Sequence, residues 1–232
     1  DLTAGTVFLA DNVQVSNNVA GSGYGGGIYI QNGTSILNHV TIAANSSNYL
    51  GGGIAIIRGD HTITNSIISS NLGDYGVWVH DFLPNISYSN LWDNQTGDYY
   101  NNTHTDWIGQ EVTNNANGDS CDMYFNISFD PLFQANSYEL STTSPSIDAG
   151  DPQDSYDADG SITDQGGLES EFGSPLPIVI NVPSEYSTIQ VALNAANPSH
   201  TVLVQPGTYY ENIIWPETNG IKLISAGDSS NT

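Results

Sequence analysis

Short runs of alternating apolar residues, separated by polar clusters, recur along the first hundred residues of the chain. The phrase GGGIYI at 25–30 returns as GGGIAI at 51–56, and a weaker copy, GVWV, stands at 76–79. Apolar residues occupy every second position, as in Ile28 and Ile30, which is the period of a β-strand. β-branched and aromatic residues dominate the runs, and Gly or Asn clusters separate them, so we predict short strands joined by tight turns.

A second set of runs repeats with the same drift in spacing. Each run closes on Asn, and an apolar residue stands three positions before it. The closing residues are Asn18, Asn45, Asn71 and Asn94, and the apolar residues are Val15, Ile42, Ile68 and Leu91. Both series advance by 27, 26 and 23 residues, and a further apolar series, with steps of 27 and 23, is Ile36, Ile63 and Ile86. Features that drift together indicate internal repetition.

Units of this size, with two or three short strands each, cannot bury an apolar face alone and must stack on a neighbour. We therefore predict an all-β parallel solenoid with coils of about 23–27 residues. Parallel stacking would place Ile28, Ile54 and Val77 above one another in the core, with the closing Asn residues hydrogen-bonded in a row at one corner. Glycine before a strand suits a corner that needs positive φ or close backbone approach. A β-sandwich with similar turns is the alternative, but its antiparallel strands need no fixed period.

The phrases GGGIYI and GGGIAI and the Asn-ended strands carry a family resemblance. The chain resembles the right-handed parallel β-helix proteins, the superfamily of pectate lyases and pectin esterases, and especially the large extracellular bacterial surface proteins with such repeats. The stretch DPLFQANSYELSTTSPSIDAGDP at 130–152 is similar to the terminal part of these helices. The resemblance implies a right-handed parallel β-helix in an extracellular or cell-surface protein.

The C-terminal segment resembles the beginning of such a helix, not its end. It predicts a short helix with Ser187 as N-cap, stopped by Pro198. The expected helix runs through Ile189, Leu193 and Ala196. TVLVQPGTYYENI at 201–213 then predicts a strand, a Pro-Gly turn and a second strand. The helix would cap the open end of a coil, as a solenoid requires.

These assignments divide the chain into four regions. They are 1–129 for the coils, 130–165 for an acidic closing region, 166–181 for a linker rich in Gly, Ser and Pro, and 182–232 for the start of a following β-helix unit. A closing region thus precedes an opening one. We interpret this order as one period of a head-to-tail array, or as a subunit whose C-terminal coil completes the open helix of the next subunit. Either gives a linear fibre, because a contact that does not close generates a filament; a fragment of one domain and part of the next is the alternative.

The charge balance limits the classes of partner. The 232 residues hold 25 acidic side chains against two basic ones, Arg58 and Lys222, which gives a net charge of −23. Phosphate binding needs a basic surface, so we exclude nucleic acid and anionic membranes as partners. No stretch approaches the ~20 apolar residues of a membrane span. The chain begins DLTAGT, so we expect a mature form or an excised piece.

Catalysis is weighed because the resembling family includes enzymes that act on polysaccharides. A lyase of this fold would need a basic proton abstractor, and we interpret Arg58 instead as a corner residue paired with an acid. The aspartates of the first hundred residues are scattered, without the carboxylate pair of a glycosidase. The five histidines show no metal-ligand spacing: His39, His61, His80, His104 and His200. The lone Cys121 excludes an intrachain disulfide; we expect a buried thiol, with an interchain bridge as the alternative. We predict no enzyme.

The acidic segment DAGDPQDSYDADGSITDQGG at 148–167 is the best candidate for a metal site. Its candidate ligands are Asp151, Asp154, Asp157, Asp159 and Asp164. The letters DADGS resemble the first part of a calcium loop, although the twelve-residue spacing and the closing Glu are missing. Ca²⁺ binding, which would relieve self-repulsion in so acidic a chain, is one interpretation. A solvated acidic loop is the other.

Asn-x-Ser/Thr sequons indicate covalent glycans. The candidate acceptors are Asn32, Asn45, Asn85, Asn94, Asn101 and Asn126. At the ends of strands, Asn45 and Asn94 would project a glycan outward from a corner, whereas an Asn ladder inside the coil would block it. Aromatic residues between 92 and 128 could stack sugars, but burial under a long loop is the preferred interpretation.

The sequence therefore predicts a structural β-solenoid at the cell surface or outside the cell. We expect it to assemble head-to-tail with copies of itself into a glycosylated, calcium-stabilised filament or surface layer. The alternatives are a carbohydrate-active, lyase-like or glycan-binding module, and an adhesin domain of a giant surface protein. The scarcity of basic residues and the inverted order of the regions favour the structural subunit.

Overall fold

The computed structural model of the protein describes residues 7–103, 107–157, 159–168, 170, 172, 173, 178–197, 200–218 and 220–227. The chain is an all-β parallel solenoid of about 7 turns, with one short helix in its described part. It divides into two compact units. Unit 1 comprises Asp1–Ser155 and Thr163–Phe172, and unit 2 comprises Tyr156–Ile162 and Gly173–Thr232.

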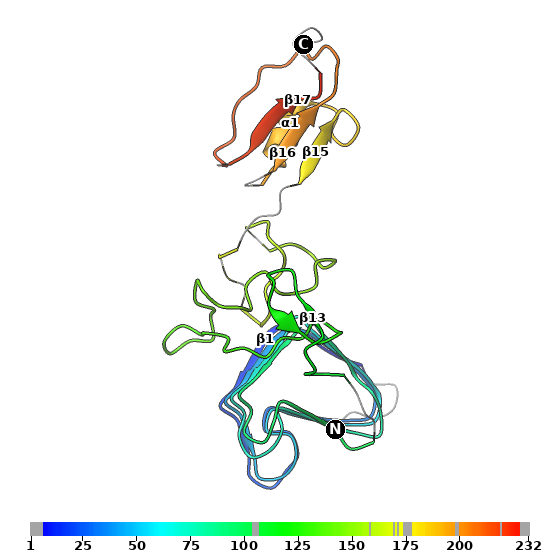
Figure 1. Ribbon diagram of the computed structural model, residues 1–232, viewed down its shortest axis with the longest axis vertical. Helices are drawn as coiled ribbons and strands as arrows, with labels where there is room; N and C mark the ends of the chain where they lie inside the picture. The colour runs from blue at the N-terminus through cyan, green and yellow to red at the C-terminus, as the bar shows by residue number, and fades with distance from the viewer. Residues whose placement is uncertain are drawn as a thin grey trace. The chain divides into compact units, whose positions relative to one another are not determined.

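Unit 1 is a coil of parallel strands in three sheets. The first sheet holds β1 (Val7–Ser16), β4 (Thr34–Ala43), β7 (Asp60–Thr64), β8 (Ile67–Ser69), β10 (Asn85–Ser87) and β11 (Asn90–Trp92). The second sheet holds β3 (Ile28–Gln31), β6 (Ile54–Ile57), β9 (Val77–His80) and β12 (Tyr99–Asn101). The third is the pair β2 (Val19–Ala20) and β5 (Ser46–Ser47). In Figure 1 the turns of unit 1 lie over one another around a three-sided outline, which places strands distant in sequence side by side.

The predicted stacking of the glycine phrases is confirmed. Ile28 pairs with Ile54, and Ile54 with Val77, so successive turns are in register across the second sheet. The step is 54 − 28 = 26 residues and then 77 − 54 = 23 residues. The series Val15, Ile42, Ile68 and Leu91 is confirmed as well.

One predicted series is wrong by a single residue. Ile63 stacks on Ile86 as expected, but its partner in the preceding turn is Leu37 and not Ile36. Leu37 is fully buried, whereas Ile36 is 43% exposed. Ile36 and Leu37 are both apolar, so the apolar pattern alone does not tell which of them faces the core. Adjacent residues of a strand point to opposite faces, so only one of the two can do so.

The closing asparagines form a hydrogen-bonded ladder at one corner, as predicted. The Nδ2 of Asn18 donates to Asn45 Oδ1 at 3.0 Å, and the Nδ2 of Asn45 donates to Asn71 Oδ1 at 3.1 Å. Asn71 continues to Asn94 Oδ1 at 2.9 Å. Each rung also accepts a backbone N–H of the preceding turn, as Asn71 Oδ1 does from Asn45 at 3.0 Å. The ladder thereby satisfies backbone groups where the chain bends between strands.

The glycines before the second-sheet strands make the corners that the sequence predicts. Gly25 and Gly51 have φ of 63° and 72°, in the left-handed region that glycine favours. At Gly26 a Cβ would lie 2.2 Å from the carbonyl oxygen of Gly52. Successive turns therefore approach too closely at this corner for any side chain.

The two ends of unit 1 differ. After β11, the segment 107–129 covers the coil: Leu91 N–H donates to the Ile127 carbonyl at 3.0 Å, and Tyr88 N–H to the Tyr124 carbonyl at 3.0 Å. This segment includes the antiparallel pair β13 (Thr113–Asn114) and β14 (Ser120–Cys121). At the opposite end, β1, β2 and β3 are edge strands among the described residues. Within the described residues, the segment 107–129 covers one end of unit 1, and no turn covers β1, β2 and β3 at the other.

Two segments of unit 1, 144–155 and 163–167, lie on the outside of the first sheet. They contact a polar row on successive turns through hydrogen bonds of 2.7–2.9 Å: Ser146 with Asn90, Asp154 with Asn65, Thr163 with His39, and Gly167 with Thr41. In Figure 1 the green to yellow loops accordingly lie outside the coil. The first residues of the predicted linker, 166–181, are thus packed on the strands of unit 1. Gly166 and Gly167 lie so close to these strands that a larger side chain at either position would clash with them.

Unit 2 is a three-stranded parallel sheet with a helix. The strands, in sheet order, are β15 (Val179–Val182), β16 (Thr201–Val204) and β17 (Lys222–Ser225). Helix α1 (Ile189–Asn194) packs Ala192 and Leu193 against the apolar side chains of β15 and β16. The sheet begins at Val179, inside the predicted linker, so the linker is shorter than the sequence suggested.

Two predictions about unit 2 are wrong. The N-cap of α1 is Thr188, whose side chain accepts the Val191 N–H at 3.2 Å, and not Ser187. No second strand follows β16 within 201–213. Instead, the Glu211 carboxylate accepts the N–H groups of Ile189 and Gln190 at 2.9 and 3.0 Å. The segment after the Pro-Gly turn is held by the first turn of the helix, where N–H groups are unpaired, and not by a sheet.

Candidate functional site

β17 is the exposed edge strand of unit 2. The N–H groups of Lys222 and Ala226 donate to carbonyls on the β16 side at 2.9 and 2.8 Å. Because backbone groups alternate in direction along a strand, Leu223 and Ser225 direct their N–H and C=O to the other side. All four residues of β17 are exposed. The strand therefore offers a free parallel edge for further hydrogen bonding.

Apolar surface accompanies this free edge. A groove of about 460 Å³ runs beside β17 and is lined in part by Ile189, Val204 and Tyr209. On β17 itself, Leu223 is 39% exposed and Ile224 is 47% exposed. Within the described residues, this edge of unit 2 thus combines backbone groups that point away from the sheet with partly exposed apolar side chains.

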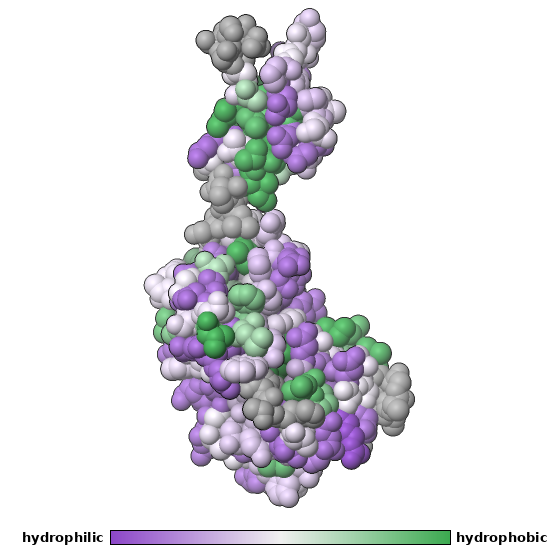
Figure 2. Space-filling view, turned by 45° about the vertical axis from the view of Figure 1, so that its right-hand side comes forward, coloured by the Kyte–Doolittle hydropathy of each residue, from purple (hydrophilic) through white to green (hydrophobic). Residues whose placement is uncertain are grey.

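β1 is the corresponding edge of unit 1. The Asn17 N–H donates to the Ala43 carbonyl at 3.3 Å, and the Val15 carbonyl accepts from Asn45 Nδ2 at 2.9 Å. By alternation, Gln14 and Ser16 direct their N–H and C=O away from β4. The apolar residues exposed on β1 and β2 are Val7, Leu9, Val13 and Val19. On the side that Figure 2 shows, hydrophobic residues otherwise form separate patches among hydrophilic ones.

The two open edges have opposite polarity along the coil. Unit 1 is sealed after its last turn and open before its first. In unit 2, α1 packs on the face of β15 and β16, and β15 and β17 are the two edge strands; β17 is the edge whose residues are all exposed. A further turn on unit 2 must follow β17 in the parallel sense, and a further turn on unit 1 must precede β1. The β17 edge of one copy could therefore pair in parallel with the β1 edge of another copy.

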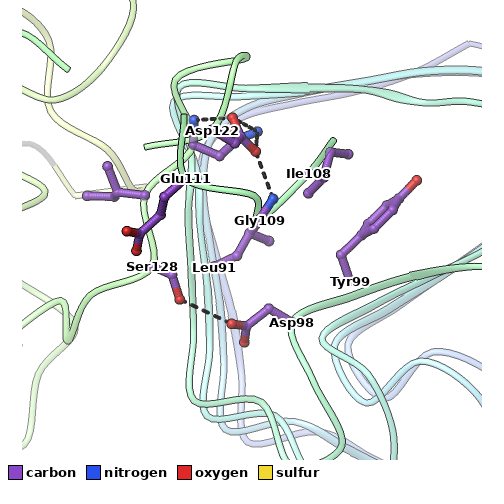
Figure 3. Close-up of a pocket in the computed structure, with 10 residues that line it drawn as sticks. Leu91, Asp98, Tyr99, Ile108, Gly109, Glu111, Asp122 and Ser128 are labelled. Carbon is purple, nitrogen blue, oxygen red and sulfur yellow. Dashed lines mark hydrogen bonds between the residues drawn. The ribbon is translucent and has the colours of Figure 1, made fainter. Parts of the chain in front are cut away.

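A pocket of about 240 Å³ lies under the segment that seals unit 1 (Figure 3). The Asp98 carboxylate accepts from Asn94 Nδ2 at 2.8 Å, which ends the asparagine ladder, and from Ser128 Oγ at 3.2 Å. Asp122 accepts from the Gly109 N–H at 2.9 Å and from the backbone N–H of Asn126 at 3.0 Å. These carboxylates fasten the covering segment to the last turn, so we interpret them as structural.

The five candidate metal ligands are distributed over both units. Asp151, Asp154 and Asp164 belong to unit 1, and Asp157 and Asp159 belong to unit 2. Their oxygens accept hydrogen bonds in local turns, as Asp151 does from Gln153 and Asp159 from Ser161, at 2.9 and 2.8 Å. Within the described residues no group of three or more His, Cys, Asp or Glu side chains is arranged to hold a metal ion. Ca²⁺ binding by these residues stays a prediction.

Asp164 is the most deeply buried member of this set, at 1% exposed. Its carboxylate accepts the Asp148 N–H at 2.9 Å, and the N–H and hydroxyl of Ser170 at 2.9 and 2.5 Å. Burial raises the pKa of Asp164, and the hydrogen bonds from Ser170 and Asp148 oppose that rise. The side chain holds the end of the outer segment against unit 1.

Three of the six candidate glycan acceptors are buried. Asn45 and Asn94 are rungs of the ladder, and Asn126 Nδ2 donates to the Ile86 carbonyl at 2.8 Å. Their exposed fractions are 0%, 7% and 3%, which leaves no space for a sugar on Nδ2 in the folded chain. The signal that could have excluded Asn45 and Asn94 was their place in the asparagine series.

The other three acceptors stay predictions. Asn85 is exposed and Asn32 is half-buried at a turn with φ of 68°. The Nδ2 of Asn101 donates to the Phe82 carbonyl at 2.8 Å. Asn85 and Asn32 are therefore the two positions where a glycan would disturb the fold least.

The remaining candidate residues have structural surroundings. Arg58 pairs with Asp81 at 3.2 Å at an exposed corner, as predicted. Cys121 is a buried thiol, and burial raises its pKa. The histidines also have structural surroundings. Burial lowers the pKa of His61 and of His200, and His61 hydrogen-bonds Ser35 at 2.8 Å. His39 hydrogen-bonds Thr163, and His80 pairs with Asp81. His104 lies outside the described residues.

Comparison with known proteins gives no match: no protein-family model, no curated protein and no solved structure is significantly similar to the chain. The fold is consequently assigned from its own strand register. None of the helical residues that the structure describes forms a segment with the length and hydropathy needed to cross a bilayer.

Proposed function

We propose that the protein is a structural subunit that assembles head-to-tail, with the β17 edge of one copy pairing in parallel with the β1 edge of the next. The observation that carries the proposal is the opposite polarity of the two open edges. Addition of a strand to a free sheet edge is a recurrent mode of recognition, in which main-chain hydrogen bonds supply affinity. A contact of this kind does not close on itself, so its product is a filament.

The exposed apolar residues support the same proposal. Leu223 on β17 and Val13 on β1 lie in register with the buried Val202 and Val40, so both would leave water when one edge covers the other. Long free edges are a liability that proteins blunt with charge, proline or coverage. Lys222 is the one charged residue on β17, and coverage by another copy removes the liability.

The resemblance to large extracellular bacterial β-helix proteins adds a setting to this proposal. Such a filament or surface layer would lie outside the cell, with glycans on Asn32 or Asn85 and with cations offsetting the net charge of −23. Release of the chain by mild heating of cell-surface preparations, and sugar on those two residues in glycopeptide mass spectrometry, are the expected results.

The test of assembly is the substitution Ser225→Pro. Proline removes the N–H that points to the free side of β17 and leaves the bonds of Lys222 and Ala226 to β16 in place. We expect wild-type protein to form linear filaments in negative-stain electron microscopy and to sediment as a broad, concentration-dependent species. Ser225→Pro is expected to remain a monomer under the same conditions.

The matched control is Ser225→Ala, which loses the 3.2 Å contact of the hydroxyl with Gly227 but keeps the backbone N–H. It should assemble like the wild type. Gln14→Pro, with Gln14→Ala as its control, applies the same test to the β1 edge. A wild-type chain that stays monomeric at every concentration, or proline variants that assemble normally, would show that these edges do not pair.

A further inference from the structure

The outer side of the second sheet carries a row of aromatic residues. Tyr29, Ala55, Trp78 and Tyr100 occupy neighbouring positions across β3, β6, β9 and β12. Their strand neighbours, such as Ile54 and Ile56, are fully buried in the core. Because successive side chains of a strand point to opposite faces, the row points outward.

The loops before these strands add three tyrosines, Tyr24, Tyr49 and Tyr75. The ring centroid of Tyr24 lies 5.3 Å from Tyr29 and 6.3 Å from Trp78, whose strands flank β6. The small Ala55 between them is fully covered, so Tyr24 occupies the space that a larger residue there would fill. Tyr49 meets Tyr24 edge-on at 5.1 Å, and Tyr75 stacks on Tyr100 at 4.9 Å. The aromatic face is the set Tyr24, Tyr29, Tyr49, Tyr75, Trp78 and Tyr100.

Ring contacts hold this surface rigid while part of it stays open. Tyr49 is 58% exposed and Tyr100 is 39% exposed, whereas Trp78 is 7% exposed beneath its neighbours. Among the described residues, no hydrogen bond uses the hydroxyls of Tyr24, Tyr29, Tyr49, Tyr75 and Tyr100. The face therefore offers ring surfaces and free hydroxyl groups at fixed positions.

The outward positions of the second-sheet strands carry no carboxylate. Beside the row they hold Gln31, Ile57 and His80. This is notable in a chain with 25 acidic residues and a net charge of −23. The composition of the face thus selects against ligands that are recognised by charge.

We propose that the aromatic face binds an uncharged glycan chain. A pyranose ring presents C–H groups on its flat side, which suit the electron-rich face of a tyrosine ring, and hydroxyls at its rim, which suit the phenol groups. Tyr49 and Tyr100 supply the exposed rings, and the packed Tyr24, Tyr29, Tyr75 and Trp78 hold them in place.

Charge argues against other occupants. The repulsion between two chains of net charge −23, which Lys222 partly offsets at the β17 edge, is offset by neither Arg58 nor Lys222 at the outward positions of the second sheet. An acidic polysaccharide meets the same repulsion, and a polycation finds no carboxylate in the row. A neutral glycan has the apolar faces and hydroxyls to match the site without this cost.

The experiment is native gel electrophoresis in gels that contain mixed-linkage β-glucan, galactomannan or dextran, with polygalacturonate as the charged comparison. We expect at least one neutral polysaccharide to retard the wild-type protein and polygalacturonate not to do so. The double substitution Tyr49→Ala and Tyr100→Ala should weaken the retardation about tenfold. Tyr210→Ala, which removes a 94% exposed tyrosine in unit 2, should leave it unchanged.

Circular dichroism of each variant verifies that it is folded. The variant Ser225→Pro separates glycan binding from assembly, because it should not assemble but should be retarded by the glycan like the wild type. No retardation by any of the three neutral polysaccharides would overturn the proposal. So would equal retardation by polygalacturonate, or full retardation of the double variant. A double variant whose sedimentation changes without glycan would assign the face to protein contacts, and thus also overturn the proposal.

Discussion

Units 1 and 2 pair their strands in the same parallel manner, yet they bury comparable sequences to very different extents. The strand IAII of β6 has its first three residues fully buried, whereas all four residues of KLIS in β17 are exposed. β6 pairs with a strand on each side, whereas β17 pairs on one side only in the part of the chain that the structure describes. Burial in a solenoid is a property of neighbouring turns as much as of the strand itself.

The same reasoning explains the asparagine ladder. Asn71 has a rung above and below it and is fully buried, whereas Asn18 ends the ladder at the open edge and is exposed. A residue of one type therefore has a different energetic role at the middle and at the end of the stack. The comparison of middle and end positions leads to three predictions.

The largest effect is expected for Ile56→Ala in the middle of unit 1. Ile56 is fully buried, so its truncation should lower the free energy of unfolding by about 4 kcal/mol through lost transfer energy and a cavity. Leu223→Ala at the open edge should cost less than about 1 kcal/mol in the unassembled protein, because the side chain already meets water. Urea titration followed by circular dichroism, in the Ser225→Pro background, measures both values. Equal costs would contradict the dependence on neighbouring turns.

A smaller loss is expected for Asn71→Ala. The substitution leaves the Asn45 N–H and the Ile42 carbonyl without the partners they have at 3.0 Å, and both lie inside the coil. Unpaired buried polar groups of this kind should lower stability by about 3 kcal/mol in total. Asn18→Ala is the matched control at the exposed end, with an expected loss of about 0.5 kcal/mol. The same urea titration measures both losses. Equal losses for Asn71→Ala and Asn18→Ala would show that the buried ladder does not stabilise the coil.

The smallest effect concerns pH. Burial raises the pKa of Asp164 in the folded chain, so the folded state binds the proton more tightly than the unfolded state. The protonated Asp164 therefore adds to the free energy of unfolding. This added stability is fully present below the pKa of 3.8 that an unperturbed aspartate has, and it is lost as pH rises through the higher pKa of the folded state. Relative to Asp164→Asn, the wild type should lose stability between pH 3.5 and neutral pH, as urea titrations at both pH values would show. The exposed Asp11→Asn is the control, and a gap that widens in the opposite direction would reverse the assigned cause.

Much of the fold follows from periodicity. The parallel stacking of Ile28, Ile54 and Val77, the asparagine ladder, the glycine corners and the short helix were all predictable, because each recurs once per turn or carries a local capping signal. The predictions failed where two neighbouring residues were chemically equivalent, as with Ile36 and Leu37, or Ser187 and Thr188. Local pattern does not select between such neighbours; packing does.

The candidate site was less accessible from the sequence. The head-to-tail order suggested two incomplete ends, but the free edges of β1 and β17 required the strand register. Of the aromatic face, only Tyr100 belongs to the aromatics of 92–128 that the sequence marked as able to stack sugars; Tyr24, Tyr49 and Tyr75 follow one another at the repeat spacing, but only the strand register shows that they share a face with Tyr100. The aspartates of 148–167 are close in sequence, and the structure shows that Asp151 and Asp159 accept hydrogen bonds from the backbone two residues further on.

By itself the sequence determined the repeat, its spacing and the residue types that stack, because a short strand with an apolar face has no stable partner other than another copy of itself. Only the tertiary structure decided which apolar residue of a pair faces inward, which asparagines are too buried to carry sugar, and which edges remain unpaired. Those outcomes depend on what lies on each side of a turn in space, and the chain does not encode that information at any single position.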